Sequence, residues 1–441
     1  MTTKLPKKRT TRYKKVDVVN VYLWGKHIGA VALDPSWGYY VFEYTPEFAS
    51  LGMEPSPLHM PVLKGETFIF TELSDITFKR LPAMLADTLP DDFGNALIDR
   101  YMAEKGLDKS KVTALDRLAY MGNRAMGALE YKPTRSPKHK PSAIVLNDLV
   151  TQARRAIEGT LDDDHHTNAA LRSILDVGTS AGGARAKAVI AWNATTQEIR
   201  SGQLDVPDGF EHWLLKFDGM GSDNELGGGT DYGRIEYAYS LMAKKAGIDM
   251  SDCRLLEENG RAHFMTKRFD RASSNIRHHI QTLCAMNHLD YKKKGTNSYE
   301  QLFITMESLS LPYTQKEEAY RRMVFNVAGK NCDDHTKNIS FRLRRGYSWE
   351  LAPAYDISFA HNPNGEWTHQ HLMSINGRFK DFARADLLAV ANRFGIGSAP
   401  DVIDQVLTSI ASWPSFAAQA GVPKSVANTI GSYHMLELYK K

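Results

Sequence analysis

The sequence contains little cysteine and no long apolar run. Its three cysteines, Cys253, Cys284 and Cys332, are too few and too scattered for a disulfide framework or a CxxC metal knuckle. There is no stretch of about 18 apolar residues, which argues against a transmembrane helix. The basic N-terminus is not followed by an apolar segment, so it lacks the pattern of a secretory signal. We therefore expect a protein of the reducing cytoplasm that has no membrane partner.

The chain also lacks a large excess of charge of either sign. Its formal net charge is +4, and seven of its 55 basic residues lie in residues 1–15, which contain no Asp or Glu. The remaining 48 basic residues face all 51 acidic residues, so the body of the protein has no positive excess with which to bind DNA. For the tail, a solvated and disordered segment is the favoured interpretation. Direct contact of this tail with nucleic acid is the alternative.

The length of 441 residues suggests two or three cores at roughly 100–200 residues for each domain. Alternating apolar residues and glycine turns predict a β-meander over 16–44. A segment rich in Pro, Lys and Ser at 132–142 indicates a linker. From about 298 onward helical spacing dominates. Three short apolar segments look like strands of one sheet, with a helix between the second and the third: strands 187–192, 212–217 and 262–268, and helix 234–246.

The most informative motif is CDDHTKN at 332–338, which lies between a predicted helix and an alternating strand. In protein kinases an Asp accepts the proton of the substrate hydroxyl, and an Asn five residues later binds Mg²⁺. Asp333 and Asn338 have this spacing, and Lys337 between them could offset phosphate charge. Asp356 directly follows a strand end, 18 residues after Asn338, where a kinase keeps its main metal-binding Asp. Two carboxylates and an amide suit a hard cation that also binds phosphate oxygens.

Each of these acids taken alone is better explained as a turn or cap residue. The kinase interpretation gains support from Lys216, which ends the apolar strand His212–Phe217. A charged side chain in that position is costly unless it is paired. Kinases use such a lysine on the α- and β-phosphates and orient it with a helix glutamate. Glu236 is the natural partner, although the dipole of its own helix would favour it equally at this place.

Small residues at 178–187 (GTSAGGARAK) form a candidate phosphate loop. Glycines allow backbone N–H groups to approach a polyphosphate closely. The loop is not a Walker A motif, because Ala184 stands where a lysine is required, and it is not GxGxxG. Alone, it is weak support for nucleotide binding.

Taken in order, these motifs resemble the HipA-like toxin kinases over nearly the whole chain. The resemblance rests on the small-residue loop with its trailing lysine, the strand lysine, KRFDR at 267–271, Asp-x-His-x-Lys-Asn and Tyr-Asp-Ile. Segments 21–33 and 89–92 look like the family's N-terminal subdomain. The resemblance implies an α+β, two-lobed protein-kinase-like fold with a β-rich N-terminal lobe and a mainly α-helical C-terminal lobe. We expect these parts: a disordered tail 1–15, an N-terminal subdomain 16–131, a linker 132–145, the nucleotide-binding part of the N-lobe 146–268 and the catalytic C-lobe 269–441.

The resemblance also implies roles for individual residues, with ATP and Mg²⁺ as cofactors. Asp333 is expected as the catalytic base assisted by Lys337, and Asn338 and Asp356 as Mg²⁺ ligands. The loop 178–187 is expected to close over the nucleotide and to be autophosphorylated at Ser180 or, failing that, Thr179. A phosphate there adds a charge of about −1.5 to −2 and would oppose closure over ATP. The expected nucleotide-contacting residues are Lys216, Glu236, Ser180, Ala181, Gly182, Gly183, Lys187, Lys267, Phe269 and His335.

As partners, the resemblance implies a helix-turn-helix antitoxin of HipB type bound to operator DNA, and a protein substrate of the translation machinery such as an aminoacyl-tRNA synthetase. Two other functions stay open: a non-catalytic binding or co-repressor protein with the same fold, and a kinase acting on a lipid or small molecule. Two features depart from the family pattern. The segment 279–291 keeps the family's Gln and Cys but lacks its usual acidic residue just before them. Asp334 stands where the family usually has glycine, and it would either bind metal indirectly or face solvent.

Overall fold

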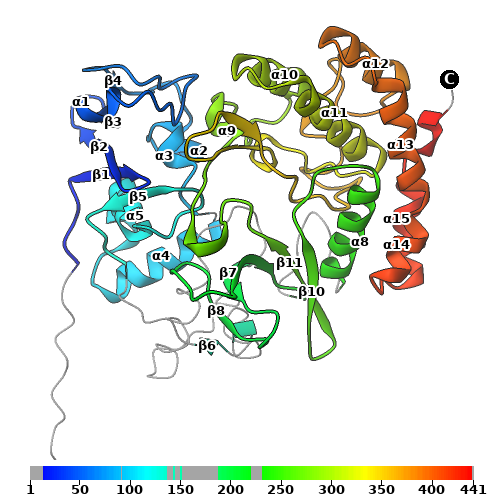
Figure 1. Ribbon diagram of the computed structural model, residues 1–441, viewed down its shortest axis with the longest axis horizontal. Coiled ribbons are helices and arrows are strands. Elements are labelled where there is room, and N and C mark those ends of the chain that lie inside the picture. Colours follow the sequence, from blue (N-terminus) through cyan, green and yellow to red (C-terminus); the bar gives the residue numbers. More distant parts are fainter. Residues whose placement is uncertain are drawn as a thin grey trace, which may run out of the picture.

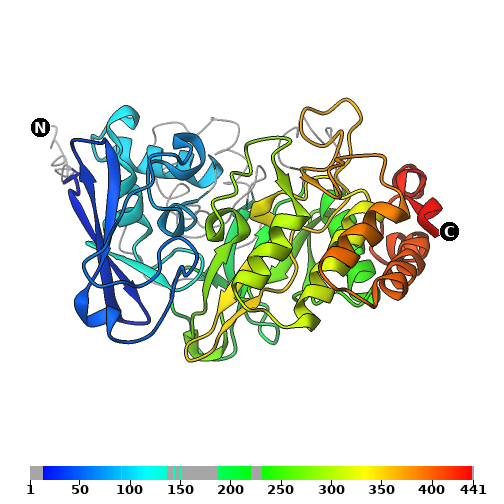
Figure 2. The same cartoon turned by 90° about the horizontal axis from the view of Figure 1, so that it is seen from above.

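The computed structural model describes residues 13–90, 92–136, 143–144, 149–150, 187–219 and 231–439. Most of the basic tail, the loop 178–186 and the glycine-rich segment 220–230 lie outside these residues. Figures 1 and 2 show a β-sheet at one end of the molecule, a layer of helices at the opposite end, and a second sheet between them.

The first sheet has the strand order β4-β3-β2-β1-β5 and is antiparallel throughout. Buried and partly exposed residues alternate along β1: Val19, Val21 and Leu23 are fully buried, and the residues between them are not. The buried side chains therefore form the inner face of the sheet. The predicted meander is confirmed. Its elements are β1 (Val18–Leu23), β2 (Lys26–Asp34), β3 (Tyr39–Tyr44), β4 (Thr67–Phe68) and β5 (Leu129–Lys132), with α1 (Pro46–Ala49), α2 (Asp75–Phe78), α3 (Ala83–Ala86), α4 (Asp92–Glu104), η1 (Lys109–Lys111) and α5 (Ala114–Met121).

The second sheet has the order β10-β11-β9-β7-β8-β6. It contains the three predicted strands, and the predicted helix α8 lies between β9 and β10 in the chain. The start of α8 packs directly on the sheet: a Cβ at Gly233 would lie 1.9 Å from the carbonyl oxygen of Ala262 in β11. Glycine at this position therefore sets how closely α8 approaches the strands. The elements are β6 (Ala143–Ile144), β7 (Lys187–Trp192), β8 (Ile199–Ser201), β9 (Glu211–Lys216), α8 (Tyr232–Lys245), β10 (Cys253–Glu258) and β11 (Arg261–Lys267).

The C-terminal part is mainly helical around one large apolar core. A small antiparallel sheet, β12-β14-β15, lies beside it, and β13 pairs with β16. The α+β fold, β-rich first and helical last, is confirmed. Its elements are η2 (Ser273–Asn275), β12 (His279–Thr282), α9 (Leu283–Met286), β13 (Asn297–Ser298), α10 (Tyr299–Ser308), α11 (Tyr313–Ala328), η3 (Thr336–Asn338), β14 (Ser340–Leu343), β15 (Trp349–Leu351), β16 (Met373–Ser374), α12 (Arg384–Arg393), α13 (Ala399–Ala411), α14 (Trp413–Gln419), α15 (Lys424–Tyr433) and η4 (Leu436–Tyr439). Within the described part of the chain, none of the helices has the length and apolarity to span a bilayer.

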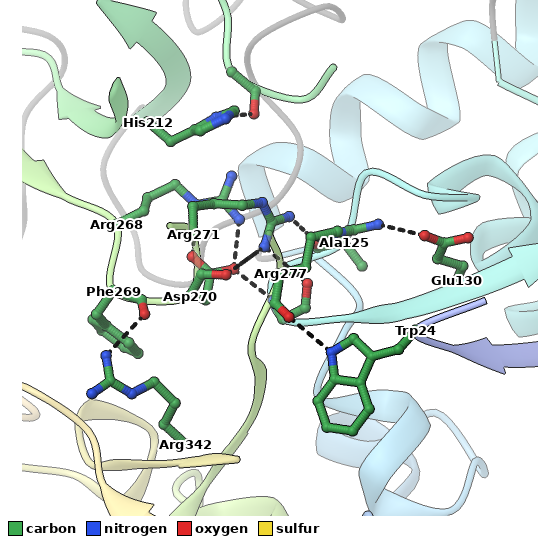
Figure 3. Close-up of polar contacts among 12 residues, drawn as sticks. Trp24, Ala125, Glu130, His212, Arg268, Phe269, Asp270, Arg271, Arg277 and Arg342 are labelled. Carbon is green, nitrogen blue, oxygen red and sulfur yellow. Dashed lines mark hydrogen bonds and ion pairs between the residues drawn. The ribbon is translucent and has the colours of Figure 1, made fainter. Parts of the chain in front are cut away.

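A buried ion cluster joins the first sheet to the second (Figure 3). The Asp270 side chain is 1% exposed and accepts hydrogen bonds from Arg268 (2.7 and 2.9 Å), Arg271 (2.6 Å) and the backbone N–H of Gly127 (2.7 Å). Arg271 also donates to the carbonyl oxygens of Gly127 and Ala125, just before β5. Burial by itself would raise the pKa of Asp270, but the two guanidinium groups hold it well below its usual range. Residues 267–271 (KRFDR) thus connect the end of the second sheet to the segment before β5.

A second arginine contact extends the same junction. Arg277 pairs with Glu130 of β5 at 3.0 Å and donates to the carbonyl of Ala125, and its own carbonyl accepts from the indole N–H of Trp24 at 2.8 Å. These contacts tie β1 and β5 to the segment that follows β11.

A buried polar network holds the loop before η3. Asp334 is 2% exposed and accepts from the Tyr299 hydroxyl (2.9 Å), from Nδ1 of His371 (2.8 Å) and from the backbone N–H of Leu372 (2.8 Å). It does not face solvent, so that interpretation of its departure from the family pattern is wrong. It lines the same small cavity as Asn338 and Asp356, and indirect metal binding stays a prediction. Its role is to anchor the loop to α10 and to the segment before β16.

The surroundings of His371 in this network favour the positively charged form of its imidazole. Burial would lower its pKa, but the adjacent Cys332 thiol and the Asp334 carboxylate raise it to about 10. Conversely, burial would raise the pKa of the Cys332 thiol, yet His371 lowers it to about 7. Positive charge on His371 is thus balanced within the core by two acidic groups.

We predict that Asp270→Asn strongly destabilises the protein. The substitution leaves Arg268 and Arg271 buried without a counter-charge, which costs about 3–5 kcal/mol in the free energy of unfolding. Urea unfolding at pH 7 measures it. Asp252→Asn is the matched control, because the pair of Asp252 with Lys244 is exposed (71% and 39%) and such a pair contributes at most about 1 kcal/mol. Equal unfolding curves for the two variants would show that the Asp270 ion cluster does not stabilise the fold.

We also predict a pH dependence of stability due to His371. A folded-state pKa above the unfolded value of 6.5 stabilises the protein fully below pH 6.5, and this contribution is lost as the pH rises toward 10. Comparing Cys332→Ala with Cys332→Ala/His371→Gln removes the competing titration of the thiol. In this background Asp334 is left to raise the pKa of His371, so the first variant should lose stability relative to the second as the pH rises above 6.5. Parallel curves of stability against pH would show that Asp334 does not hold His371 protonated.

Candidate active site

Lys216 lies at the centre of the candidate site. It ends β9, and its ammonium group is bonded to Glu236 of α8 and, at 2.5 Å, to Asp356 after β15. The Lys216 side chain is 11% exposed and that of Glu236 5%. Burial would lower the pKa of Lys216, but the two carboxylates raise it well above its ordinary value. The lysine is therefore a permanent cation, oriented by a helix glutamate as predicted.

Asp356 is held in an unusual backbone conformation, with φ at 53°. A non-glycine residue in the left-handed region costs on the order of 1 kcal/mol and is found most often at functional sites. Burial would raise the pKa of Asp356, but Lys216 and Lys187 hold it at about 2. The carboxylate stays ionised at any physiological pH and is aimed at the lysine.

Lys187 contributes a second positive charge. It begins β7 directly opposite Lys216 in the antiparallel register, and it is buried. Its positive charge helps to lower the pKa of Asp356, and it partly offsets the other groups that raise the pKa of Asp333. Since such an influence falls off with distance, two lysines from adjacent strands and two acids from separate loops share one site.

Asp333 is the exposed member of the loop before η3, with a side chain 49% accessible. Its backbone carbonyl accepts from the Asn338 amide nitrogen at 2.8 Å, which closes the loop. Its carboxylate lies 3.7 Å from Nε2 of His335. Partial desolvation raises the pKa of Asp333, His335 opposes this, and the Asp356 charge raises it further. A carboxylate with a raised pKa and open access to solvent suits a proton acceptor.

Tyr355 links these loops. Its hydroxyl donates to the carbonyl of Lys337 at 2.7 Å and lies 2.6 Å from the hydroxyl of Ser340. Its ring packs on Phe269 with centroids 5.6 Å apart, and the Phe269 carbonyl accepts from Arg342. Tyr355 therefore connects the Asp356 loop to the Lys337 loop and to the residue next to Asp270.

Asn338 and Asp356 both line one small cavity of about 30 Å³ between η3, α11 and the 354–357 loop. The two expected Mg²⁺ ligands thus border the same cavity. The amide nitrogen of Asn338 donates to the carbonyl of Asp333, which leaves the amide oxygen of Asn338 to serve as a ligand. In the part of the chain that the structure describes, no group of three or more His, Cys, Asp or Glu could hold a metal by itself. This donor set fits Mg²⁺, which takes one or two carboxylates and completes its shell with phosphate oxygens and water.

Lys267 is not brought to Lys216. Phe264 of β11 is the residue opposite Lys216, and Lys267 lies three positions farther along, about 10 Å at strand spacing. Its ammonium group pairs with Glu211 at 2.5 Å, at the other end of β9. Of the expected loop residues, Ser180, Thr179, Ala181, Gly182 and Gly183 lie outside the described residues.

The sequence analysis missed Tyr355 as a connecting residue, and it did not find His371. Tyr355 belongs to the Tyr-Asp-Ile motif, in which only Asp356 was assigned a role. No local signal marks His371, because it lies 37 residues from Asp334 and the two meet only in the folded chain.

Comparison with known proteins agrees with this architecture. A family model described as HipA-like C-terminal domain matches residues 179–414, and one described as HipA N-terminal domain matches residues 19–132. A solved structure of the Shewanella oneidensis MR-1 toxin–antitoxin system, HipA with HipB and operator DNA, superposes with a TM-score of 0.67 at 17% identity, covering 96% of both chains. This likeness shows the fold.

A crystal structure of the Helicobacter pylori proinflammatory kinase CtkA aligns with 52% of this chain and 89% of its own, at 13% identity and a TM-score of 0.34. That likeness is too low to bear on this chain. The HipA-like C-terminal domain alone, in contrast, spans more than half of the sequence. The chain therefore belongs to the HipA-like family.

Proposed function

We propose that this protein is an ATP-dependent serine/threonine protein kinase, the toxin of a HipA-like toxin–antitoxin system. The observation that carries the proposal is the shared position of Lys216 between Glu236 and Asp356, beside the accessible Asp333. Phosphoryl transfer needs little covalent chemistry from the protein, and depends on positioning and charge stabilisation. A fixed cation, ionised metal ligands and a proton acceptor in one place meet that need.

Each residue then has a role. Lys216 binds the α- and β-phosphates and Glu236 orients it, while Lys187 and Lys337 add positive charge near the transferred group. Asn338 and Asp356 would hold Mg²⁺, and the bound ion would neutralise phosphate charge. Asp333 accepts the hydrogen bond of the acceptor hydroxyl and then its proton, and its raised pKa favours that task. His335, 3.7 Å from Asp333, is close enough to influence its charge.

The partner is proposed from the family. The Shewanella structure contains HipA together with HipB and operator DNA, and we propose a helix-turn-helix antitoxin of HipB type for this chain as well. Direct DNA contact would involve at most the basic tail. The proposed target is a protein of the translation machinery, such as an aminoacyl-tRNA synthetase, phosphorylated in the cytoplasm with growth arrest as the result.

We predict that Asp333→Asn abolishes protein phosphorylation. Loss of a general base lowers the rate about 10²–10⁴-fold, while binding of ATP, which does not depend on this carboxylate, should persist. Purified protein incubated with γ-labelled ATP, Mg²⁺ and cell extract gives the rate, and Asp252→Asn, whose exposed carboxylate pairs with Lys244, is the control. Equal rates for Asp333→Asn and the unaltered protein would favour a non-catalytic binding protein. Label found only in small molecules would point to a kinase of another class.

We predict that self-phosphorylation occurs in the loop 178–187, at Ser180. Ser180→Ala should remove most of the label from the protein itself, whereas Thr179→Ala should leave it in place. Mass spectrometry of the phosphopeptides after incubation with ATP makes the assignment. An unchanged phosphopeptide map in Ser180→Ala would move the site elsewhere.

A further inference from the structure

We propose that Tyr291, Lys292 and Lys293, here called the Tyr291 platform, bind an acidic residue of the protein substrate next to its acceptor serine or threonine. This inference rests on the proposed kinase function and names the substrate class of the same site. The roles given above use none of these three residues.

The platform lies beside the proposed base. The rings of Tyr291 and His335 have centroids 5.1 Å apart, and His335 in turn lies 3.7 Å from the Asp333 carboxylate. The ammonium group of Lys337 lies 5.4 Å from the centroid of the Tyr291 ring. A substrate whose hydroxyl reaches Asp333 therefore passes within a few residues of Tyr291.

The backbone under the platform is fixed. Asp290 is 8% exposed and accepts from the Thr77 hydroxyl (2.5 Å) and from the backbone N–H of Lys292 (2.9 Å). The Thr336 hydroxyl, in the loop of Asp333, donates to the carbonyl of Leu289 at 2.7 Å. The segment is thus tied both to the N-terminal part and to the loop that carries the base. A rigid support of this kind is what a specificity-determining contact requires.

The charge on the platform is uncompensated. Lys293 is exposed, and the Lys292 ammonium group lies 5.8 Å from the Tyr291 ring. Among the described residues, neither lysine forms an ion pair with an acid. Lys294, the next residue, differs: it pairs with Glu366 at 2.5 Å and lies 4.1 Å over the Trp367 ring. The run of three lysines therefore contains one structural lysine and two that are available to a partner.

An acidic protein segment fits this surface better than a nucleic acid does. A polyanion is bound through a broad basic surface with many phosphate contacts. The body of this chain has slightly more acidic than basic residues, and the platform offers only two lysines around one ring. Such a site suits one or two carboxylates, and pairing in this exposed position changes affinity several-fold for each lysine.

The experiment maps phosphorylation sites made by the purified full-length protein in dephosphorylated cell extract with ATP and Mg²⁺. We expect sites with Asp or Glu within two residues of the acceptor to be enriched about tenfold over sites flanked by neutral residues. In Lys292→Glu/Lys293→Glu this enrichment should disappear and sites flanked by Lys or Arg should replace them. Lys294→Ala is the matched control and should keep the preference for acidic flanks, because the charge of Lys294 is already paired with Glu366.

The outcomes separate the two proposals. If the unaltered protein phosphorylates no protein at all, the proposed function itself has failed. If it phosphorylates proteins without acidic enrichment, or if Lys292→Glu/Lys293→Glu keeps the acidic preference, the platform is overturned while the kinase stands. A parallel extract treated with nuclease tests whether the platform binds nucleic acid instead of an acidic protein segment. Loss of the lysine-dependent sites in that extract would assign the platform to a phosphate backbone and overturn the acidic-peptide proposal.

Discussion

The buried carboxylate of Asp270 is the constraint on which the arrangement of this molecule depends. A charge removed from water is tolerated only when its partners are all in place, and here the partners come from both sides of a junction: arginines that follow β11, and the backbone of Gly127 before β5. The residue between Arg268 and Asp270 is Phe269, which packs on Tyr355, the neighbour of Asp356. One short segment therefore fixes the N-terminal part, the second sheet and a proposed metal ligand relative to one another.

The candidate site also contains buried charges that are compensated by nearby groups, but its acids differ from one another in burial and in pKa. The two cations Lys216 and Lys187 lie near three carboxylates, those of Glu236, Asp356 and Asp333, so most of the charge at the site is compensated within the protein. Glu236 and Asp356 are strongly held, the latter with a pKa of about 2, whereas Asp333 is half-exposed and its pKa is raised. The proposed metal ligand and the proposed proton acceptor thus differ in burial and in the nearest cation. Asp334, buried next to Asp333, serves a third purpose, which is to keep the loop in place.

Sequence patterns predicted the strands β7, β9 and β11 and the helix α8, because apolar alternation and helical spacing are local signals. They also singled out Lys216, Asp333, Asn338 and Asp356, because the spacing within each motif reflects a single loop or strand end. Apart from the pair of Glu236 with Lys216, they did not predict which groups the acids pair with. The backbone N–H of Gly127, one of the partners of Asp270, lies 143 residues away, and the partners of Asp334 include Tyr299 and His371. Lys267 was placed at the nucleotide from its motif alone, whereas its pairing with Glu211 depends on the register of two strands.

The central claim is that side chains from β9, η3 and the loop after β15 gather around one magnesium–nucleotide complex. Crystals grown with a non-hydrolysable ATP analogue and Mn²⁺ in place of Mg²⁺ test it most directly, because the anomalous signal of manganese locates the ion. The account predicts a peak bound by the amide oxygen of Asn338 and the carboxylate of Asp356, with the phosphates of the analogue in contact with Lys216. A nucleotide bound elsewhere, or a manganese peak away from these two side chains, would contradict it.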